Sequence, residues 1–282
     1  MSYDSSVRGK YFRVNALHKT KSFNVINSKE NGLFGSSKKK QPLPLKGARI
    51  EDYALIGDCE TAALVSREGS IDWLCWPTFS SGACFAALLG TAENGYWSLR
   101  PSAEIRSTSR RYRPDTMVLE TTYVTDTGEV CVTDFMPPRG KNSDIIRIVQ
   151  GIRGKTQMRM ELAIRFDYGL TIPWVTRHED ELRAVAGENM VVLRTQCGHG
   201  PSVEFEGEDL KTVSNFEVTA GNEACFTLTY SASNADIPKA VSPQKELANT
   251  ISYWSEWSER AQFDGPFKAS VARSLMTLKA MT

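Results

Sequence analysis

The sequence predicts a mainly β protein, a large antiparallel sandwich followed by helices toward the C-terminus. Three observations favour this fold class. One long stretch alternates apolar and polar residues, turn-forming residues recur between short β-rich runs, and the periodicity becomes helical only after about residue 240. The chain has 282 residues, 41% of them hydrophobic, so it is long enough to bury a substantial core.

Residues 158–167 carry the clearest strand pattern. Apolar Met158, Met160, Leu162, Ile164 and Phe166 alternate with polar Arg159, Glu161, Arg165 and Asp167. Successive side chains of a strand point to opposite faces, so a period of two predicts a half-buried strand. Arg165 and Asp167 share the polar face, where an exposed ion pair would contribute only about 0 to 1 kcal/mol.

Other segments predict tight turns between strands. Residues 116–125 and 130–135 are rich in strand-forming side chains, and Asp126 and Gly128 lie between the two runs, where they favour a hairpin. Similar turn signals lie at Glu68-Gly69, Arg153-Gly154 and Gly221-Asn222. We therefore predict an antiparallel sandwich over residues 47–235.

The last part of the chain has helical spacing. Ser242 and Pro243 suit the N-cap and the first position of a helix. Apolar residues then recur three or four apart at Leu247, Ile251, Trp254, Trp257 and Ala261. These features predict one helix over about 242–263, within a linker segment 236–265. A second apolar stripe predicts another helix over 266–282, and two such stripes lead us to expect a helical domain beyond them.

Charge is distributed unevenly along the chain. Residues 1–46 hold ten Lys and Arg against only Asp4 and Glu30, although the whole chain has a net charge of +1. This polar, basic composition predicts a flexible extension, with a mitochondrial presequence as the alternative. The remainder is mildly acidic, so we expect no nucleic-acid partner.

The six cysteines show no C-x-x-C pair and lie apart in apolar runs, which is typical of reduced, buried thiols in a cytoplasmic protein. The nearest candidate for metal binding, Cys197 with His199, lacks the second pair of ligands that a tetrahedral site needs. No stretch approaches the roughly 18 consecutive apolar residues of a membrane span. We expect no metal, no cofactor and no membrane partner; the sequence does not predict an oligomeric state.

Several ordered segments together carry a family resemblance. They read IGD at 56–58, TAALVSREGSIDWLCWP at 61–77, ACFAALLG at 83–90, RYRP at 111–114, DFMPP at 134–138, RFDYG at 165–169, PW at 173–174 and RSLMTLKA at 273–280. This series resembles the opening of the family 15 glycoside hydrolases, which include glucoamylase-like, glucodextranase-like and trehalase-like enzymes. The resemblance covers about residue 50 to the end.

The resemblance implies an N-terminal super-β-sandwich, a linker helix and the first helix of a catalytic (α/α)6 barrel. Such enzymes hydrolyse α-glucosidic bonds with inversion, using two glutamates separated by roughly 6.5 to 9.5 Å so that a water molecule fits between them. In the family both glutamates lie in the barrel, beyond the last residue here. We therefore predict no catalytic residue in this chain, and a domain that supports the barrel, rims its active site and is inactive as a fragment.

The 69–85 segment holds the predicted contacts with an α-glucan or α-glucoside substrate. Trp76 and Phe79 offer flat faces for sugar rings and Asp72 a hydroxyl acceptor, whereas we interpret Trp73 as a packing residue. Many relatives read Pro-Arg-Phe-Asp-Ser where residues 77–81 read PTFSS, so an Arg and an Asp are missing. The alternatives are a stand-alone carbohydrate-binding or scaffolding module, and a truncated copy without function.

Overall fold

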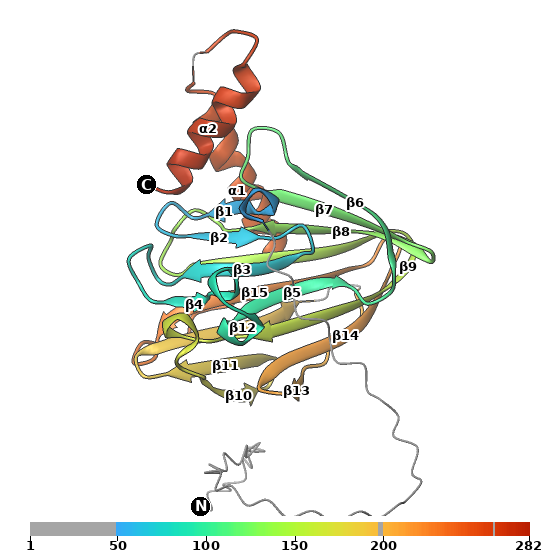
Figure 1. Cartoon of the computed structure of the whole chain (residues 1–282), viewed down its shortest axis with the longest axis vertical. Coiled ribbons are helices and arrows are strands. Elements are labelled where there is room, and N and C mark those ends of the chain that lie inside the picture. Colours follow the sequence, from blue (N-terminus) through green and yellow to red (C-terminus); the bar gives the residue numbers. More distant parts are fainter. Residues whose placement is uncertain (1–48, 197–199, 262) are drawn as a thin grey trace, which may run out of the picture. The chain divides into compact units, whose positions relative to one another are not determined.

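The structure, a computed structural model, describes residues 49–196, 200–261 and 263–282. The predicted extension over 1–46, like Cys197 and His199, lies outside the described residues. Fifteen strands in the described part form one continuous antiparallel hydrogen-bonded system (Figure 1). Short 3₁₀ turns accompany them at Ile50–Asp52, Ala87–Leu89, Ala92–Asn94 and Asp167–Gly169.

One long strand, β9 (Ser143–Ala163), organises the fold because it belongs to two sheets. Its second half pairs with β5 and β14, and its first half pairs with β8 and β15. Gly151 and Gly154 lie where the strand passes between the sheets. A Cβ at Gly151 would collide with the carbonyl oxygen of Thr219, and Gly154 has a φ of +63°, so both positions favour glycine.

The first sheet runs in the order β1-β2-β3-β5-β9-β14-β13, with β4 paired to β3. Its strands other than β9 are β1 (Ala54–Gly57), β2 (Ala62–Val65), β3 (Ser70–Cys75), β4 (Ala83–Phe85), β5 (Tyr96–Pro101), β13 (Glu206–Glu208) and β14 (Lys211–Thr219).

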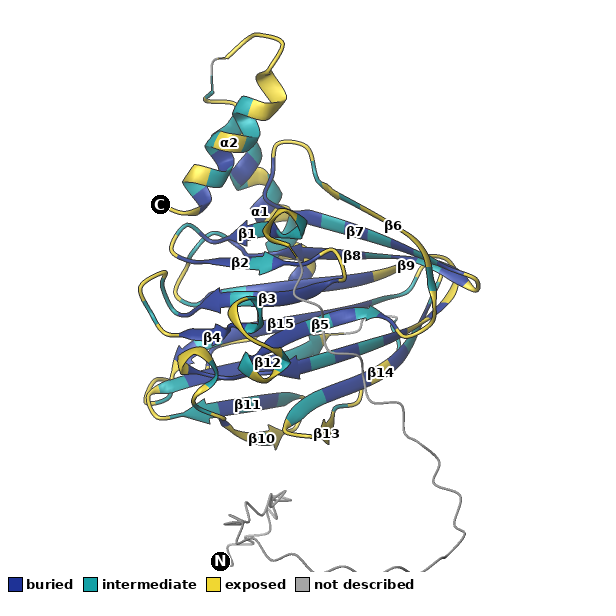
Figure 2. Ribbon diagram, viewed as in Figure 1, coloured by how far each residue is buried: buried dark blue, intermediate teal, exposed yellow. Residues whose placement is uncertain are grey.

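The second sheet runs in the order β6-β7-β8-β9-β15-β12-β11-β10. Its strands other than β9 are β6 (Ile105–Tyr112), β7 (Leu119–Thr125), β8 (Gly128–Phe135), β10 (Trp174–His178), β11 (Glu181–Ala186), β12 (Asn189–Gln196) and β15 (Glu223–Ala232). Figure 2 shows that the edge strands β6, β10 and β13 are largely exposed, whereas the central strands are buried. The predicted hairpin at 126–129 is the connection between β7 and β8.

The core lies between the two sheets, so the predicted sandwich is confirmed. One cluster of buried side chains joins Ile71 and Trp97 of the first sheet to Val132 and Leu228 of the second. The rings of Phe216 in β14 and Phe226 in β15 are 5.5 Å apart, in contact across the interior. The alternation is confirmed over 158–162, where Met158, Met160 and Leu162 are buried and the residues between them are half-buried. It ends there, because β9 stops at Ala163 and Arg165, predicted on the polar face, is buried.

A charged pair also lies inside the sandwich. Arg147 of β9 is 0% exposed, and its Nε donates to Asp134 Oδ1 of β8 at 2.7 Å. The same guanidinium donates to the carbonyl oxygens of Trp97 in β5 at 2.7 Å and of Gly69, in the turn before β3, at 2.8 Å, both on the side of the first sheet. Burial of an ion is costly unless all its hydrogen bonds are made, and here the hydrogen bonds of the pair also connect the sheets.

Two helices follow the strands. In α1 (Pro243–Ser258), Leu247 and Ile251 pack on the outer face of the second sheet, over Phe135, Ile146 and Ile148. Helix α2 (Lys268–Ala280) contributes Met276 and Ala280 to a third cluster. That cluster encloses Trp254 completely, so the sandwich and α2 together provide the partner surface that this tryptophan needs.

Both helices are shorter than the sequence predicts. Ser242 is the N-cap of α1, but its side chain makes no capping bond, and the helix ends at Ser258. Helix α2 begins at Lys268, because Gly265 and Pro266 disfavour an earlier helical turn. Among the described residues, no helix has both the length and the apolar character needed to cross a bilayer.

Candidate functional site

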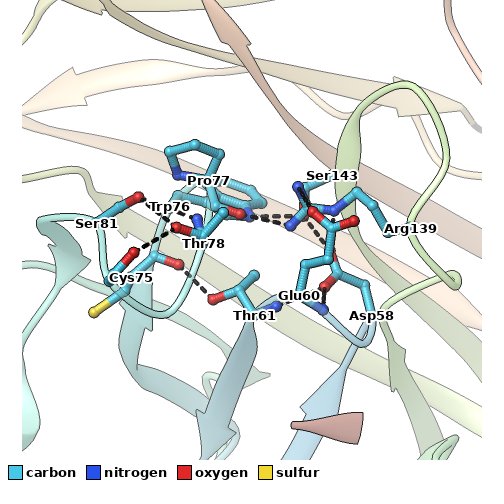
Figure 3. Close-up of polar contacts among 11 residues, drawn as sticks. Asp58, Glu60, Thr61, Cys75, Trp76, Pro77, Thr78, Ser81, Arg139 and Ser143 are labelled. Atoms are coloured by element: carbon cyan, nitrogen blue, oxygen red, sulfur yellow. Dashed lines mark hydrogen bonds and ion pairs between the residues drawn. The ribbon is translucent and has the colours of Figure 1, made fainter. Parts of the chain in front are cut away.

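Three turns meet at one end of the sandwich, around the buried carboxylate of Asp58 (Figure 3). Asp58 follows β1, and its Oδ1 accepts hydrogen bonds from the backbone N–H groups of Glu60 at 2.9 Å and Thr61 at 2.8 Å. Its Oδ2 accepts from Arg139 Nε at 2.8 Å and from Ser143 Oγ at 2.6 Å. Asp58 thus accepts four hydrogen bonds, and its role is to hold the chain in place.

These bonds continue into the neighbouring loops. Ser143 Oγ also accepts from the indole Nε1 of Trp76 at 2.8 Å, so Asp58 and Trp76 are joined through one hydroxyl. Arg139 Nη2 donates to the carbonyl oxygen of Pro77 at 2.6 Å, and Thr61 Oγ1 donates to that of Cys75 at 2.6 Å. The β1–β2 turn, the loop after β3 and the segment before β9 are therefore fixed to one another.

The consequence is an ordered loop over residues 76–82. The backbone N–H of Phe79 donates to the carbonyl oxygen of Glu60 at 3.1 Å, and the N–H of Trp76 donates to that of Gly82 at 3.3 Å. Phe79 remains 43% exposed. The backbone of this loop is already ordered by hydrogen bonds on both sides. A ligand that contacts the exposed aromatic side chain therefore costs little further conformational entropy.

A cleft of about 330 Å³ opens beside this loop, between the ends of the two sheets. The first sheet supplies the loop after β3 and the residues that follow β9, and the second supplies the start of β12 and the end of β15. The lining residues are Trp76, Pro77, Ser81, Gly82, Phe166, Asp167, Glu188, Asn189 and Tyr230.

One wall of the cleft has an unusual backbone. Asp167, Tyr168 and Gly169 have φ values of 52°, 61° and 108°, in the left-handed region that non-glycine residues rarely adopt. The Asn94 Nδ2 group donates to the carbonyl oxygen of Tyr168 at 2.8 Å, and the Phe166 N–H bonds to the Thr171 carbonyl oxygen at 2.9 Å. This turn replaces the predicted extension of the strand, so Asp167 faces the cleft, while Arg165 is buried and donates to Ile164 and Leu210.

The structure separates the predicted substrate contacts. Trp76 lines the cleft but is only 3% exposed, and Phe79 stands on the outer loop. Asp72 is buried in β3, where its carboxylate accepts from Tyr53 at 2.7 Å and from Ser70 at 2.5 Å. Trp73 is half-buried, with its ring 6.1 Å from that of Tyr168. The cleft therefore brings Trp76 together with residues that the sequence did not indicate.

The residues missed by sequence reasoning are Asp58, Arg139, Ser143, Glu188, Asn189 and Tyr230. Asp58 lies inside the quoted IGD segment, and Arg139 follows a Pro-Pro pair that reads as a simple turn. Their partners are 62 to 85 residues away along the chain, so no local pattern links them.

The part of the chain that the structure describes contains no cluster of side chains suited to bind a metal ion. No three His, Cys, Asp or Glu side chains gather there in a way that could hold a metal ion. Burial raises the pKa of the Cys75 and Cys84 thiols, so both favour the protonated form, which is a poor nucleophile.

Comparison with known proteins decides the family. The family described as trehalase-like, N-terminal, matches residues 40–254, which is most of the chain. The chain belongs to this trehalase-like N-terminal family. The resemblance to family 15 glycoside hydrolases is confirmed at the level of an N-terminal β-sandwich domain.

Relatives of this trehalase-like domain are longer proteins. The trehalase of Mycobacterium tuberculosis is 28% identical over 284 aligned positions, which cover 89% of this chain but 39% of that protein. The trehalase of Thermoplasma volcanium is 25% identical, with 83% of this chain and 37% of that protein covered. The chain therefore spans about two fifths of the length of the curated relatives it matches.

A solved structure has the same fold. A bacterial glucoamylase in complex with acarbose matches with a TM-score of 0.58 at 11% identity, over 84% of this chain and 41% of that one. At this identity the match shows the fold alone. The trehalase-like domain thus has a glucoamylase-like β-sandwich, and at its loop end the carboxylate of Asp58 fixes three loops.

Proposed function

We propose that this chain is the non-catalytic N-terminal domain of a trehalase- or glucoamylase-like glycoside hydrolase. The observation that carries the proposal is the Asp58 network, which fixes three loops at one end of the sandwich and uses all of that carboxylate's oxygens in doing so. A rigid loop end of this kind suits a domain that supports a catalytic barrel and rims its active site.

The substrate of the intact hydrolase is proposed to be an α-glucoside. The trehalase relatives support this class, and the non-catalytic role agrees with the resemblance, which assigns both catalytic glutamates of the family to the barrel. We also propose a cytoplasmic location, because buried Cys75 and Cys84, which form no disulfide, suit a reducing compartment.

Among the predicted contacts, Phe79 has the most surface to offer a sugar ring. We propose that it stacks against substrate at the rim, with Trp76 behind it as part of the cleft. Asp72 already accepts two hydrogen bonds within the domain, so its proposed contribution to sugar binding is indirect, through the placement of β3.

Assays of glucose release test the proposal. The purified 282-residue chain is incubated with trehalose, maltose and soluble starch, with the Mycolicibacterium smegmatis trehalase as the positive control on trehalose. We expect no glucose above the buffer blank from any substrate. Robust release, retained through purification to a single species, would contradict the non-catalytic role.

The second candidate is a carbohydrate-binding module that acts without a barrel. The cleft favours it, because a hollow lined by aromatic and hydrogen-bonding side chains lies on the sandwich itself. The two candidates differ in whether the domain acts beside a catalytic barrel or alone.

A further inference from the structure

The cleft between the sheet ends holds hydrogen-bonding groups that the folded domain leaves free. Glu188 is exposed, and its carboxylate accepts no hydrogen bond from the described residues. Asn189 Oδ1 accepts from the hydroxyl of Tyr230 at 2.7 Å, which orients the amide and leaves its two N–H donors available. Asp167 Oδ2 has a single long hydrogen bond, 3.3 Å from Thr171 Oγ1.

Aromatic side chains also line the cleft, of which Tyr230 is half-buried while Trp76 and Phe166 are only 3% and 4% exposed. Trp76, Phe166 and Tyr230 all contribute to its lining, and the rings of Trp76 and Tyr230 are 6.0 Å apart at an angle of 46°. Aromatic side chains beside a few oriented polar groups are the usual composition of a small-molecule site. The volume of about 330 Å³ lies at the lower end of the range of such sites, which begins at about 300 Å³.

The charges in the lining restrict the class of ligand. Asp167 and Glu188 are acidic, and neither Lys nor Arg is among the lining residues. A phosphorylated or otherwise anionic ligand would be repelled. The two carboxylates and the Asn189 amide instead suit the hydroxyl groups of a neutral sugar. Each hydroxyl can donate a hydrogen bond to a carboxylate and accept one from the amide.

The backbone supports a built site on the Asp167 side. Gly82 lies so close that a Cβ there would be 2.8 Å from Asp167 Oδ1, which leaves space for the carboxylate only because residue 82 is glycine. Asp167 and Tyr168 adopt left-handed φ values in succession. Strained conformations of this kind persist where the surrounding structure holds them, and they concentrate at ligand sites.

We propose that this cleft is a saccharide-binding site of the sandwich itself, taking one or two neutral α-glucosyl rings between Asp167 and the Glu188–Asn189 pair. The inference rests on the proposed function for the identity of the sugar and deepens it, because it places substrate affinity within this domain. Two sources share the chemistry: a free disaccharide such as trehalose, and the end of a longer α-glucan.

Calorimetric titration of the full 282-residue chain tests the site. We expect saturable binding of trehalose or maltotriose in the low millimolar range. Glu188→Gln and Asp167→Asn should each weaken it about fivefold or more, because a charged acceptor becomes neutral. Both changes preserve shape, and Asn tolerates left-handed φ values well. Glu179→Gln, in the β10–β11 turn at the opposite end of β11 from Glu188, is the matched control and should bind as wild type.

Nuclear magnetic resonance locates the bound sugar. The side-chain amide signals of Asn189 should shift with the same saturation curve as the calorimetric titration. Binding of trehalose alone would identify a free disaccharide as the ligand, whereas tighter binding of maltotriose would identify a glucan end. Either result supports the site.

Two outcomes would overturn the inference. One is the absence of saturation by either sugar in protein that melts cooperatively. The other is binding that leaves Asn189 unmoved and is equal in Glu188→Gln, Asp167→Asn and the control. Neither outcome concerns glucose release, so failure here is distinguishable from failure of the proposed non-catalytic role.

Discussion

The side chain of Asp58 fixes the positions of the three loops at one end of the sandwich. It is fully buried, yet each of its oxygens accepts two hydrogen bonds, and the Arg139 guanidinium beside it provides the opposite charge. Arg139 in turn holds Pro77, and Ser143 holds Trp76. Loss of the charge on Asp58 would therefore affect residues from three separate parts of the chain.

We predict that Asp58→Asn destabilises the domain by about 3 to 5 kcal/mol, because it removes the fully buried partner of the half-buried Arg139 and leaves that arginine only the exposed carboxylate of Glu60. Urea unfolding followed by tryptophan fluorescence measures the loss. Glu60→Gln is the matched control: Glu60 contacts the same arginine at 3.3 Å, but its side chain is 53% exposed, so its removal should cost at most about 1 kcal/mol. Equal losses of stability in the two variants would show that the burial of Asp58 does not determine the contribution of its ion pair with Arg139.

The strand β9 is the element on which the sandwich depends, and its outer face in the first sheet carries a charged cluster. Glu161 accepts from Tyr96 at 2.5 Å and from Arg159 Nε at 2.7 Å, and Lys211 of β14 lies 3.6 Å away. Burial opposes ionisation of Glu161, but these hydrogen bonds and positive charges outweigh it and lower its pKa below the usual value of 4.5.

The lowered pKa predicts an acid-sensitive contribution to stability. A carboxyl whose pKa is lower in the folded state stabilises the fold above its unfolded pKa, and this contribution is lost as the pH falls through the folded pKa. We expect the free energy of unfolding of the wild type to decrease below about pH 4.5 more steeply than that of Glu161→Gln. Urea titrations from pH 7 to pH 3 measure both slopes.

Glu206→Gln provides the control for this titration. Glu206 lies in the exposed strand β13, and the structure records no ion pair for it within the described residues. The free energy of unfolding of Glu206→Gln should fall with decreasing pH as steeply as that of the wild type. If Glu161→Gln also matched the wild type, the Tyr96, Arg159 and Lys211 contacts would not be maintained in solution.

At the scale of the whole molecule, the two helices complete the surface of the sandwich. Leu247 and Ile251 of α1 cover Phe135 and Ile146 on the outer face of the second sheet. Arg273 of α2 lies 3.9 Å from the ring centre of Tyr112 and donates to the carbonyl oxygen of Thr116 at 2.9 Å. The helices are thus packed against the sandwich through both apolar and polar contacts.

We predict that a chain ending at Pro238 exposes the apolar outer face of the second sheet. It should bind the dye anilinonaphthalene sulfonate and melt at a lower temperature than the full chain, because burial contributes about 25 cal/mol per Å² of apolar surface. A chain ending at Arg260 keeps α1 and is the matched control, with weaker dye binding. Equal dye binding by both would show that α1 does not protect this face.

Much of the architecture was predictable from local patterns. Alternation over 158–162 predicted a strand, the residues at 126–129 a turn, and the spacing after Ser242 a helix. Each of these structures repeats or closes within a few residues, so a local pattern is enough to reveal it. The helix ends were less predictable. They depend on how Gly265 and Pro266 interrupt the chain and on which side chains find a surface, as Trp254 does.

The sequence by itself determined the sandwich, the order of strands before helices and, through its ordered motifs, the family. Only the tertiary structure decided that β9 belongs to two sheets, that Asp58 joins three loops, and that Asp167, Glu188 and Asn189 line one cleft. The physical reason is distance along the chain. Periodicity encodes which face of an element is apolar, whereas a site is made by side chains that only the folding of whole sheets brings together.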